Sequence, residues 1–194
     1  EWREADGEIS DLRSGAGGGV NIGAGTAAAI DLVVPAIREL RARHPRLEIS
    51  IQVETSNVLA RELLASRHDL IIARIPEDLN PRLFESRVIG IEKACLIVRR
   101  GHPVLGARKV PLPERILNTS SLLLTLVMVA QSDAIAAVSI DVARFIRQSL
   151  GGSIDVVPLA FEIEVQPYSV ITARNRTLSA AAIMLRDAIL KRIR

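Results

Sequence analysis

The N-terminal part of the chain alternates between strand-like and helix-like segments, and this order limits the fold more than any other feature. Strand-like segments at 20–24, 47–53 and 70–73 are separated by helix-like segments at 26–44 and 58–66. The second strand alternates apolar and polar residues, whereas the first helix has apolar residues at helical spacing. A β-α-β-α-β order with short connections predicts a parallel sheet with right-handed crossovers.

The rest of the chain continues as an α/β protein in a less regular order. We expect strands at 87–98, 134–138, 156–159 and 162–173 and helices at 120–130, 140–150 and 178–193. Pro35 lies inside the first helix, where it should produce a kink or begin a fresh first turn.

Composition excludes several classes of function. Hydrophobic residues make up 48% of the chain and allow a large core, whereas 3% aromatic residues argue against a platform for single-stranded nucleic acid. The net charge is +3, and the basic residues are scattered, which favours a solvated basic surface. The single cysteine, Cys95, cannot form an internal disulfide. With no signal peptide and no membrane-spanning stretch, a reduced cytoplasmic location is expected.

A glycine motif follows the first strand-like segment. Residues 23–28 read G-x-G-x-x-A between a strand and a helix, as in proteins that bind a dinucleotide. Such proteins have a ribose-binding carboxylate about 20 residues later, but Glu54 lies 26 residues beyond Ala28, which itself replaces the third glycine. An NAD-dependent enzyme is therefore a minor alternative. Glycines also allow a tight turn that exposes amides at a helix start.

The arrangement of catalytic residue types does not favour an enzyme. His44, His68 and His102 each adjoin a turn or a helix end, and we predict that they are turn residues. The sequence has no zinc-binding spacing and no G-x-S-x-G elbow. We expect no enzyme activity, no metal site and no cofactor. Catalysis by carboxylates that are far apart in the sequence is the alternative.

Several short segments follow one another in an order known from one family. They are residues 19–24, 32–37, 44–45, 47–56, 62–64, 69–72, 96–103, 126–127, 132–138 and 174–175. This series resembles the effector-binding domain of LysR-type transcriptional regulators. The resemblance covers nearly the whole chain from Gly19 onward.

The resemblance implies an α/β fold of two Rossmann-like lobes joined by two crossing strands, like a type II periplasmic binding protein. Lobe I would comprise residues 19–91 and 163–194, and lobe II residues 92–162. Residues 1–18 would be a remnant of the linker to an absent helix-turn-helix, with residues 15–19 as the joint. The chain would bind a small-molecule effector between the lobes and form a homodimer or tetramer. It would contact DNA only through the absent part.

One departure from the family concerns lobe II. Between Glu114 and Arg115 the family has a further segment of roughly thirty residues, about the size of one β-α-β unit. Without it, lobe II would be a thin sheet, although a stable domain needs two packed layers. Either the natural protein carries a segment that this sequence omits, or the segment is deleted; the first is the preferred interpretation.

The predicted effector site lies where helices begin after strands. Its residues are Gly25, Thr26, Ala27, Thr55, Ser56, Ile75, Pro76, Thr119 and Ser120. Helix N-termini favour anions, so an organic acid or sugar acid is the expected effector. Ordinary helix capping is the alternative role of each hydroxyl. A stand-alone solute-binding protein, which should carry a signal peptide, is the alternative function with the same fold.

Overall fold

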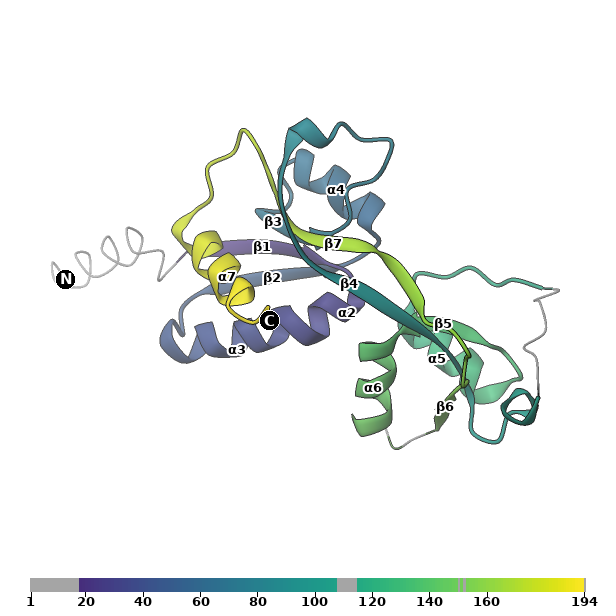
Figure 1. The fold of residues 1–194 in the computed structure, drawn as a ribbon. Helices are drawn as coiled ribbons and strands as arrows, with labels where there is room; N and C mark the ends of the chain where they lie inside the picture. The colour runs from purple at the N-terminus through teal and green to yellow at the C-terminus, as the bar shows by residue number, and fades with distance from the viewer. Residues whose placement is uncertain (1–17, 108–114, 150, 152, 194) are drawn as a thin grey trace, which may run out of the picture. The chain divides into compact units, whose positions relative to one another are not determined.

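The computed structural model describes residues 18–107, 115–149, 151 and 153–193, in which two compact units are distinguished (Figure 1). Unit 1 comprises Glu1–Gly90 and Pro167–Arg194, and unit 2 comprises Ile91–Gln166. The predicted linker remnant and Glu114, where the predicted gap begins, lie outside the described residues, apart from Gly18.

Two long strands contribute to both units. β4 spans Phe84–Arg99 and β7 spans Ile163–Ala173, and they are neighbours in one sheet. The chain therefore crosses the boundary between the units twice, once along each strand. An α/β fold with two units joined by two strands is the class that the sequence predicted.

The sheet of unit 1 is built from parallel strands. β2 (Glu48–Val53), β1 (Gly19–Ala24) and β3 (Leu70–Ala73) follow one another in the order β2-β1-β3, and β7 pairs with β3 in the antiparallel direction. The register aligns Ile22 of β1 with Leu70 of β3. All four residues of β3 are buried, as expected for a strand covered on both faces. The predicted parallel β-α-β-α-β arrangement is confirmed.

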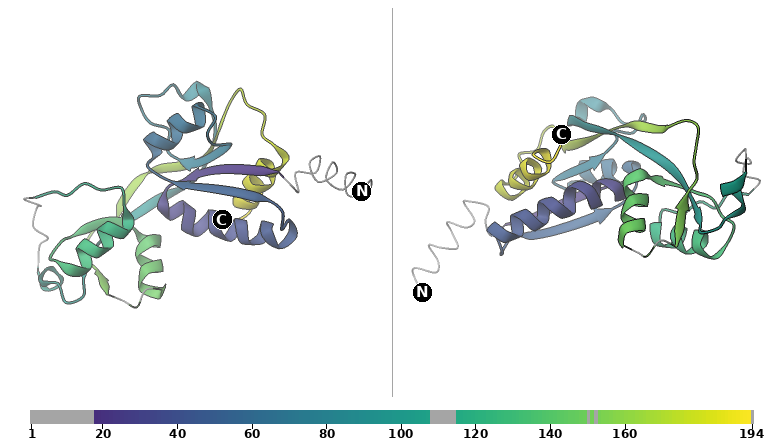
Figure 2. Two further views of the ribbon diagram at one scale, coloured as in Figure 1. Left: turned by 180° about the vertical axis from the view of Figure 1, so that it is seen from behind. Right: turned by 60° about the horizontal axis from the view of Figure 1, so that its bottom comes forward.

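Different helices cover the two faces of this sheet (Figures 1 and 2). Leu70 and Ile72 pack in one cluster with α3 (Val34–Arg43) and with α7 (Ala180–Leu190). Ile71 packs on the opposite face with α4 (Ser56–Leu64). Successive residues of β3 thus point to opposite faces, and unit 1 has a helix layer on each side of its sheet.

The first helix is continuous in the chain but changes its type just before Pro35. It runs as α2 (Thr26–Ala28), a π-helical segment η1 (Ala29–Val33) and α3 (Val34–Arg43). Pro35 lies in the first turn of α3, directly after the π-helical segment. Proline lacks an amide hydrogen, and a π-helical turn is one way in which a helix absorbs a local defect. Pro35 thus marks a fresh first turn, one of the two predicted outcomes.

Unit 2 has a small antiparallel sheet. β4 pairs with β5 (Ala136–Ser139) and with β6 (Ile154–Val156), both antiparallel. α5 (Leu122–Gln131) precedes β5, and α6 (Ile140–Ser149) follows it directly. A buried cluster of Val98, Val104 and Val157 lies beside the sheet. Two short 3-10 helices complete the described elements, η2 (Pro81–Leu83) in unit 1 and η3 (Pro103–Gly106) in unit 2.

The predicted start of α5 is wrong by two residues. The helix begins at Leu122, and the Ser121 hydroxyl accepts a hydrogen bond from the Leu124 amide at 3.2 Å. The Thr119 hydroxyl instead accepts one from the Ser121 amide at 3.1 Å. Three consecutive hydroxyl residues compete for the N-cap, and the last of them reaches the free amide.

In the described part of the chain, no helix has the length and apolar character needed to span a membrane.

Candidate functional site

Three connections gather at one edge of the unit 1 sheet and carry most of the predicted site. We name them the β1 connection (residues 25–27), the β2 connection (residues 55–56) and the β3 connection (residues 75–76), after the strands that they follow. Since the three strands are parallel neighbours, their carboxyl ends meet at the same edge of the sheet. Open α/β sheets bind ligands beyond this edge.

Backbone hydrogen bonds hold neighbouring connections together. The Gly25 amide donates to the Ile72 carbonyl at 3.2 Å, which ties the β1 connection to the end of β3. The Glu54 amide donates to the Ala24 carbonyl at 3.3 Å, which ties the end of β2 to the end of β1. The structure therefore brings the unit 1 part of the predicted site together.

Two helix N-termini open at this edge without side-chain caps. α2 begins at Thr26 after the N-cap residue Gly25, and α4 begins at Ser56 after the N-cap residue Thr55. Neither N-cap residue makes a side-chain cap hydrogen bond. Among the described residues, the hydroxyls of Thr26 and Thr55 have no partner. Ordinary capping is therefore not the role of Thr55, and both hydroxyls can bind a ligand.

The Ser56 hydroxyl links the β2 and β3 connections. Its oxygen accepts a hydrogen bond from the Arg74 amide at 3.1 Å. Because a hydroxyl has one proton to donate in addition to its acceptor lone pairs, Ser56 can still donate to a ligand. Pro76 of the β3 connection is buried and Ile75 is half-buried.

A carboxylate in this region was missed as a site residue. The Glu54 carboxylate accepts a hydrogen bond from the Thr55 amide at 3.2 Å, at the start of α4. The sequence contains this signal, because Glu54 directly follows β2 and precedes Thr55, but the predicted role of Glu54 was that of a ribose ligand. A carboxylate beside two helix N-termini adds a hydrogen-bond acceptor to a group of donors.

The unit 2 residues of the predicted site have a different local role. Thr119 and Ser120 are exposed and lie in the segment before α5. They do not begin the helix, since Ser121 is its N-cap residue. Their contact with an effector stays a prediction.

The histidines lie at turns and helix ends. His44 is the C-cap residue of α3. His102 is the N-cap residue of η3, and its buried ring accepts a hydrogen bond from the Val104 amide at 3.0 Å. His68 is buried, and its Nε2 lies 3.2 Å from a Glu62 carboxylate oxygen. No cluster of three or more His, Cys, Asp or Glu residues suited to a metal ion occurs among the described residues.

A family comparison decides what kind of domain this is. The model of the LysR substrate binding domain matches residues 13–114. The chain belongs to the LysR family. The HTH-type transcriptional regulator GbpR of Rhizobium radiobacter is 44% identical over 83% of this chain and 63% of its own length. GbpR of Azospirillum brasilense is 30% identical over 93% of this chain and 62% of its own length. The chain thus spans less than two thirds of the length of these relatives.

The alignment with the Rhizobium radiobacter relative is longer than the part of this chain that it uses. It extends over 193 residues but covers 83% of the 194 residues here. About thirty aligned positions, the size of one β-α-β unit, therefore have no residue of this chain.

Solved LysR structures have the same fold. The regulatory domain of CcmR from Synechocystis PCC6803, in complex with 2-PG, has a TM-score of 0.73 at 14% identity and covers 91% of this chain and 97% of its own. HinK of Pseudomonas aeruginosa, a LysR family regulator, has a TM-score of 0.69 at 16% identity, over 98% of this chain and 74% of its own. The predicted fold class is confirmed.

Proposed function

We propose that this chain is the effector-sensing part of a LysR-type transcriptional regulator and that it performs no catalysis. Its relatives are named HTH-type transcriptional regulators. The observation that carries the proposal is the edge of the unit 1 sheet, where two uncapped helix N-termini and two unpaired threonine hydroxyls lie together. These groups are hydrogen-bond donors suited to a ligand, and among the described residues neither threonine hydroxyl is hydrogen-bonded to a base that would activate it. The protein acts in the cytoplasm, where its DNA target is.

We infer that units 1 and 2 correspond to the two lobes and that the effector binds the β1, β2 and β3 connections of unit 1. That Thr119 and Ser120 of unit 2 also bind the effector stays a prediction. An effector that prefers one conformation shifts the population toward it. In a full-length regulator this shift changes how the helix-turn-helix part contacts DNA, and the present chain senses without binding DNA.

The chemistry of the β2 connection favours a sugar acid as the effector class. The amides at the start of α2 and the hydroxyls of Thr26, Thr55 and Ser56 donate to a carboxylate. The Glu54 carboxylate accepts from sugar hydroxyls and repels a second anionic group. A hydroxylated monocarboxylate satisfies both kinds of group, whereas a dicarboxylate or a neutral sugar satisfies one. A small molecule also occupies the related CcmR domain, whose structure contains 2-PG.

Exposed apolar residues on β2 support a homo-oligomer. β2 is an edge strand of the sheet, and Ile51 and Val53 on it are 44% and 48% exposed. An unpaired edge strand with apolar side chains is a surface that pairs with another chain. We propose that a second copy of this chain covers β2.

Calorimetry with gluconate, glucose and succinate tests the effector proposal. We expect gluconate to bind more tightly than the other two. Replacing Thr55 with Val should weaken gluconate binding about tenfold or more, the loss expected for one hydrogen bond to a charged group. The melting temperature should stay nearly unchanged, since the Thr55 hydroxyl has no partner within the described chain.

Thr177→Val is the matched control, because Thr177 is also exposed and lies outside the proposed site. It should leave gluconate binding unchanged. Two results contradict the proposal: none of the three compounds binds at millimolar concentration, or Thr55→Val lowers the melting temperature and leaves affinity unchanged.

A further inference from the structure

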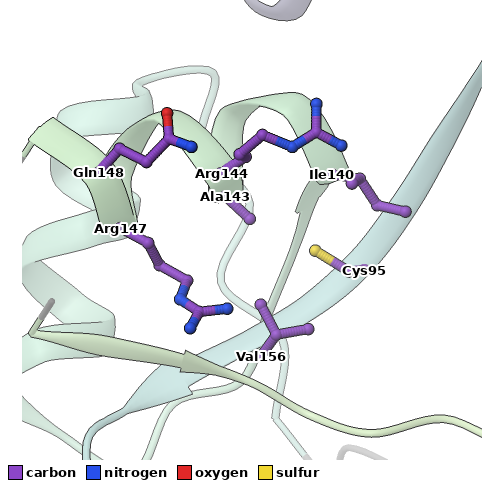
Figure 3. A pocket seen from close by; sticks show the side chains of 7 residues that line it. All are labelled: Cys95, Ile140, Ala143, Arg144, Arg147, Gln148 and Val156. Atoms are coloured by element: carbon purple, nitrogen blue, oxygen red, sulfur yellow. The ribbon is translucent and has the colours of Figure 1, made fainter.

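Unit 2 contains a cavity that its own residues form between α6 and the strands β4 and β6 (Figure 3). Its volume is about 530 Å³, within the range of small-molecule sites. Cys95 of β4 and Val156 of β6 line one side. Ile140, Ala143 and Gln148 lie on the face of α6 that lines the other.

The strand side of this cavity is lined by the small side chains of Cys95 and Val156. Cys95 is 7% exposed, and its burial raises the pKa of the thiol, so the group stays uncharged at neutral pH. Ala143 is buried opposite, and its methyl group leaves space that a longer side chain would fill. This side can accommodate an apolar group.

The helix side carries two cations. Arg144 and Arg147 both line the cavity, and Figure 3 shows the Arg147 guanidinium extending toward Val156. Among the described residues, the Arg147 guanidinium has no hydrogen bond or ion pair. Arg144 forms one, to Asp141 at 2.9 Å, which leaves its other donors available. The described residues that line the cavity include no acidic side chain, and Asp141 pairs with Arg144 and not with Arg147.

We propose that this cavity binds a small organic anion with an apolar body. The anionic group lies on the guanidinium of Arg147, with Arg144 beside it, and the apolar body covers Cys95 and Ala143. Guanidinium groups bind carboxylates through paired, charge-assisted hydrogen bonds, which a neutral ligand cannot form. All contacts are with unit 2, so this site differs from the unit 1 connections and does not depend on the proposed effector.

Three probes separate charge from apolar contact: octanoate has both, octanol has the same chain without charge, and acetate has the charge without the chain. Calorimetry on the 194-residue chain should show octanoate binding more tightly than either of the others. Arg147→Gln should weaken octanoate binding about tenfold or more. Arg100→Gln, the same charge change outside the cavity lining, should leave it unchanged. Equal affinity for octanol, or an unchanged affinity in Arg147→Gln, overturns the proposal.

Alkylation of Cys95 reports on the cavity directly, because Cys95 is the single cysteine of the chain. Saturating octanoate should slow its reaction with N-ethylmaleimide several-fold, and octanoate should protect Arg147→Gln much less at the same concentration. Ala143→Met should fill the cavity, abolish octanoate binding and slow alkylation by itself. If octanoate leaves the labelling rate of the unaltered chain unchanged, the proposal is overturned. This measurement does not depend on whether any variant folds.

Discussion

At Gly23 of β1, the side chain of Leu59 on α4 packs directly against the backbone of the strand. A Cβ atom at this position would lie 2.6 Å from Cδ2 of Leu59, 3.1 Å from Cγ2 of Ile71 and 3.2 Å from Cδ2 of His68. In the sequence this glycine both begins the G-x-G-x-x-A motif and lies in the predicted strand 20–24. The structure places it in the strand, where the missing side chain allows the helix to pack.

Gly23→Ala should therefore destabilise the chain by about 1–3 kcal/mol, the usual cost of overpacking a core. Gly19→Ala in the same strand is the control, because an added Cβ there meets nothing within 4 Å. Urea unfolding of both variants measures the difference. Equal stability of the two would show that α4 moves away without cost.

Glu62 is a carboxylate stabilised by several donors. Burial alone would raise the pKa of Glu62. Hydrogen bonds from His68, Arg67 and Gln52 lower it by more, so the pKa lies below the ordinary value of a glutamate. The contact with Gln52 is 2.7 Å and the contact with Arg67 is 3.2 Å. The ionised form thus holds the end of α4 to β2.

Glu62→Gln should lower the melting temperature at pH 7 and lose this effect in acid. Because the folded-state pKa is lowered, the stabilisation is fully present above the unfolded-state value, about 4.3, and is lost as the pH falls through the folded-state pKa. Thermal unfolding at pH 7, 5 and 3 measures it. A difference from the unaltered chain that stays constant across this range would contradict the electrostatic cause.

At the level of elements, local sequence patterns predicted the central residues of helices and strands better than the residues at which these elements begin and end. The period-two pattern of β2 and the helical spacing before His44 are local, so the parallel sheet of unit 1 could be predicted. The start of α5 depends on which of three adjacent hydroxyls finds a free amide, and this is settled by the path of the chain around Ser121.

The edge strand β2 gives a prediction about assembly. Ile51→Lys should shift an oligomer of the chain toward the monomer, because a lysine on an edge strand opposes pairing with another chain. Light scattering after size exclusion measures the mass. Leu83→Lys is the control, since Leu83 is 43% exposed, close to the 44% of Ile51, and lies in η2 and not on β2. A monomeric unaltered chain, or the same effect from both variants, would contradict the role of β2.

At the level of the whole molecule, topology explains which part of the site could be predicted. Parallel strands must end at one edge, so the three connections of unit 1 could be grouped from sequence alone. The carboxylate of Glu54 and the cavity under α6 depend on side-chain direction and on packing between distant elements. The cavity leaves no local pattern in the sequence, whereas Glu54 stands directly before Thr55 and could be found there.

Unit 2 leaves much apolar surface uncovered. The exposed apolar side chains near α5 are Ile116, Leu117, Leu123, Leu124, Val127 and Met128. We propose that the thirty or so positions aligned without a residue of this chain fall between Glu114 and Arg115, and that a β-α-β unit there would cover this surface. On this proposal, unit 2 lacks part of one of its layers.

Hydrogen exchange should then show a difference between the units. Amides of β1 and β3 should exchange more slowly than those of β5 and β6, because exchange follows local stability. Inserting the segment of the Rhizobium radiobacter relative after Glu114 should slow exchange in β5 and leave β1 unchanged. Mass spectrometry of peptides measures both. Equal protection in the two units would contradict an incomplete unit 2.

The division of unit 1 into two stretches of chain also sets the order of events during translation. β7 pairs with β3, and α7 contributes Ala182, Leu185 and Ile189 to the core beside α3. Both elements leave the ribosome only after all of unit 2 has been synthesised. Until then one edge of β3 has no partner and the residues that α7 covers face water. The length of unit 2 therefore determines how long the nascent chain waits before unit 1 can close.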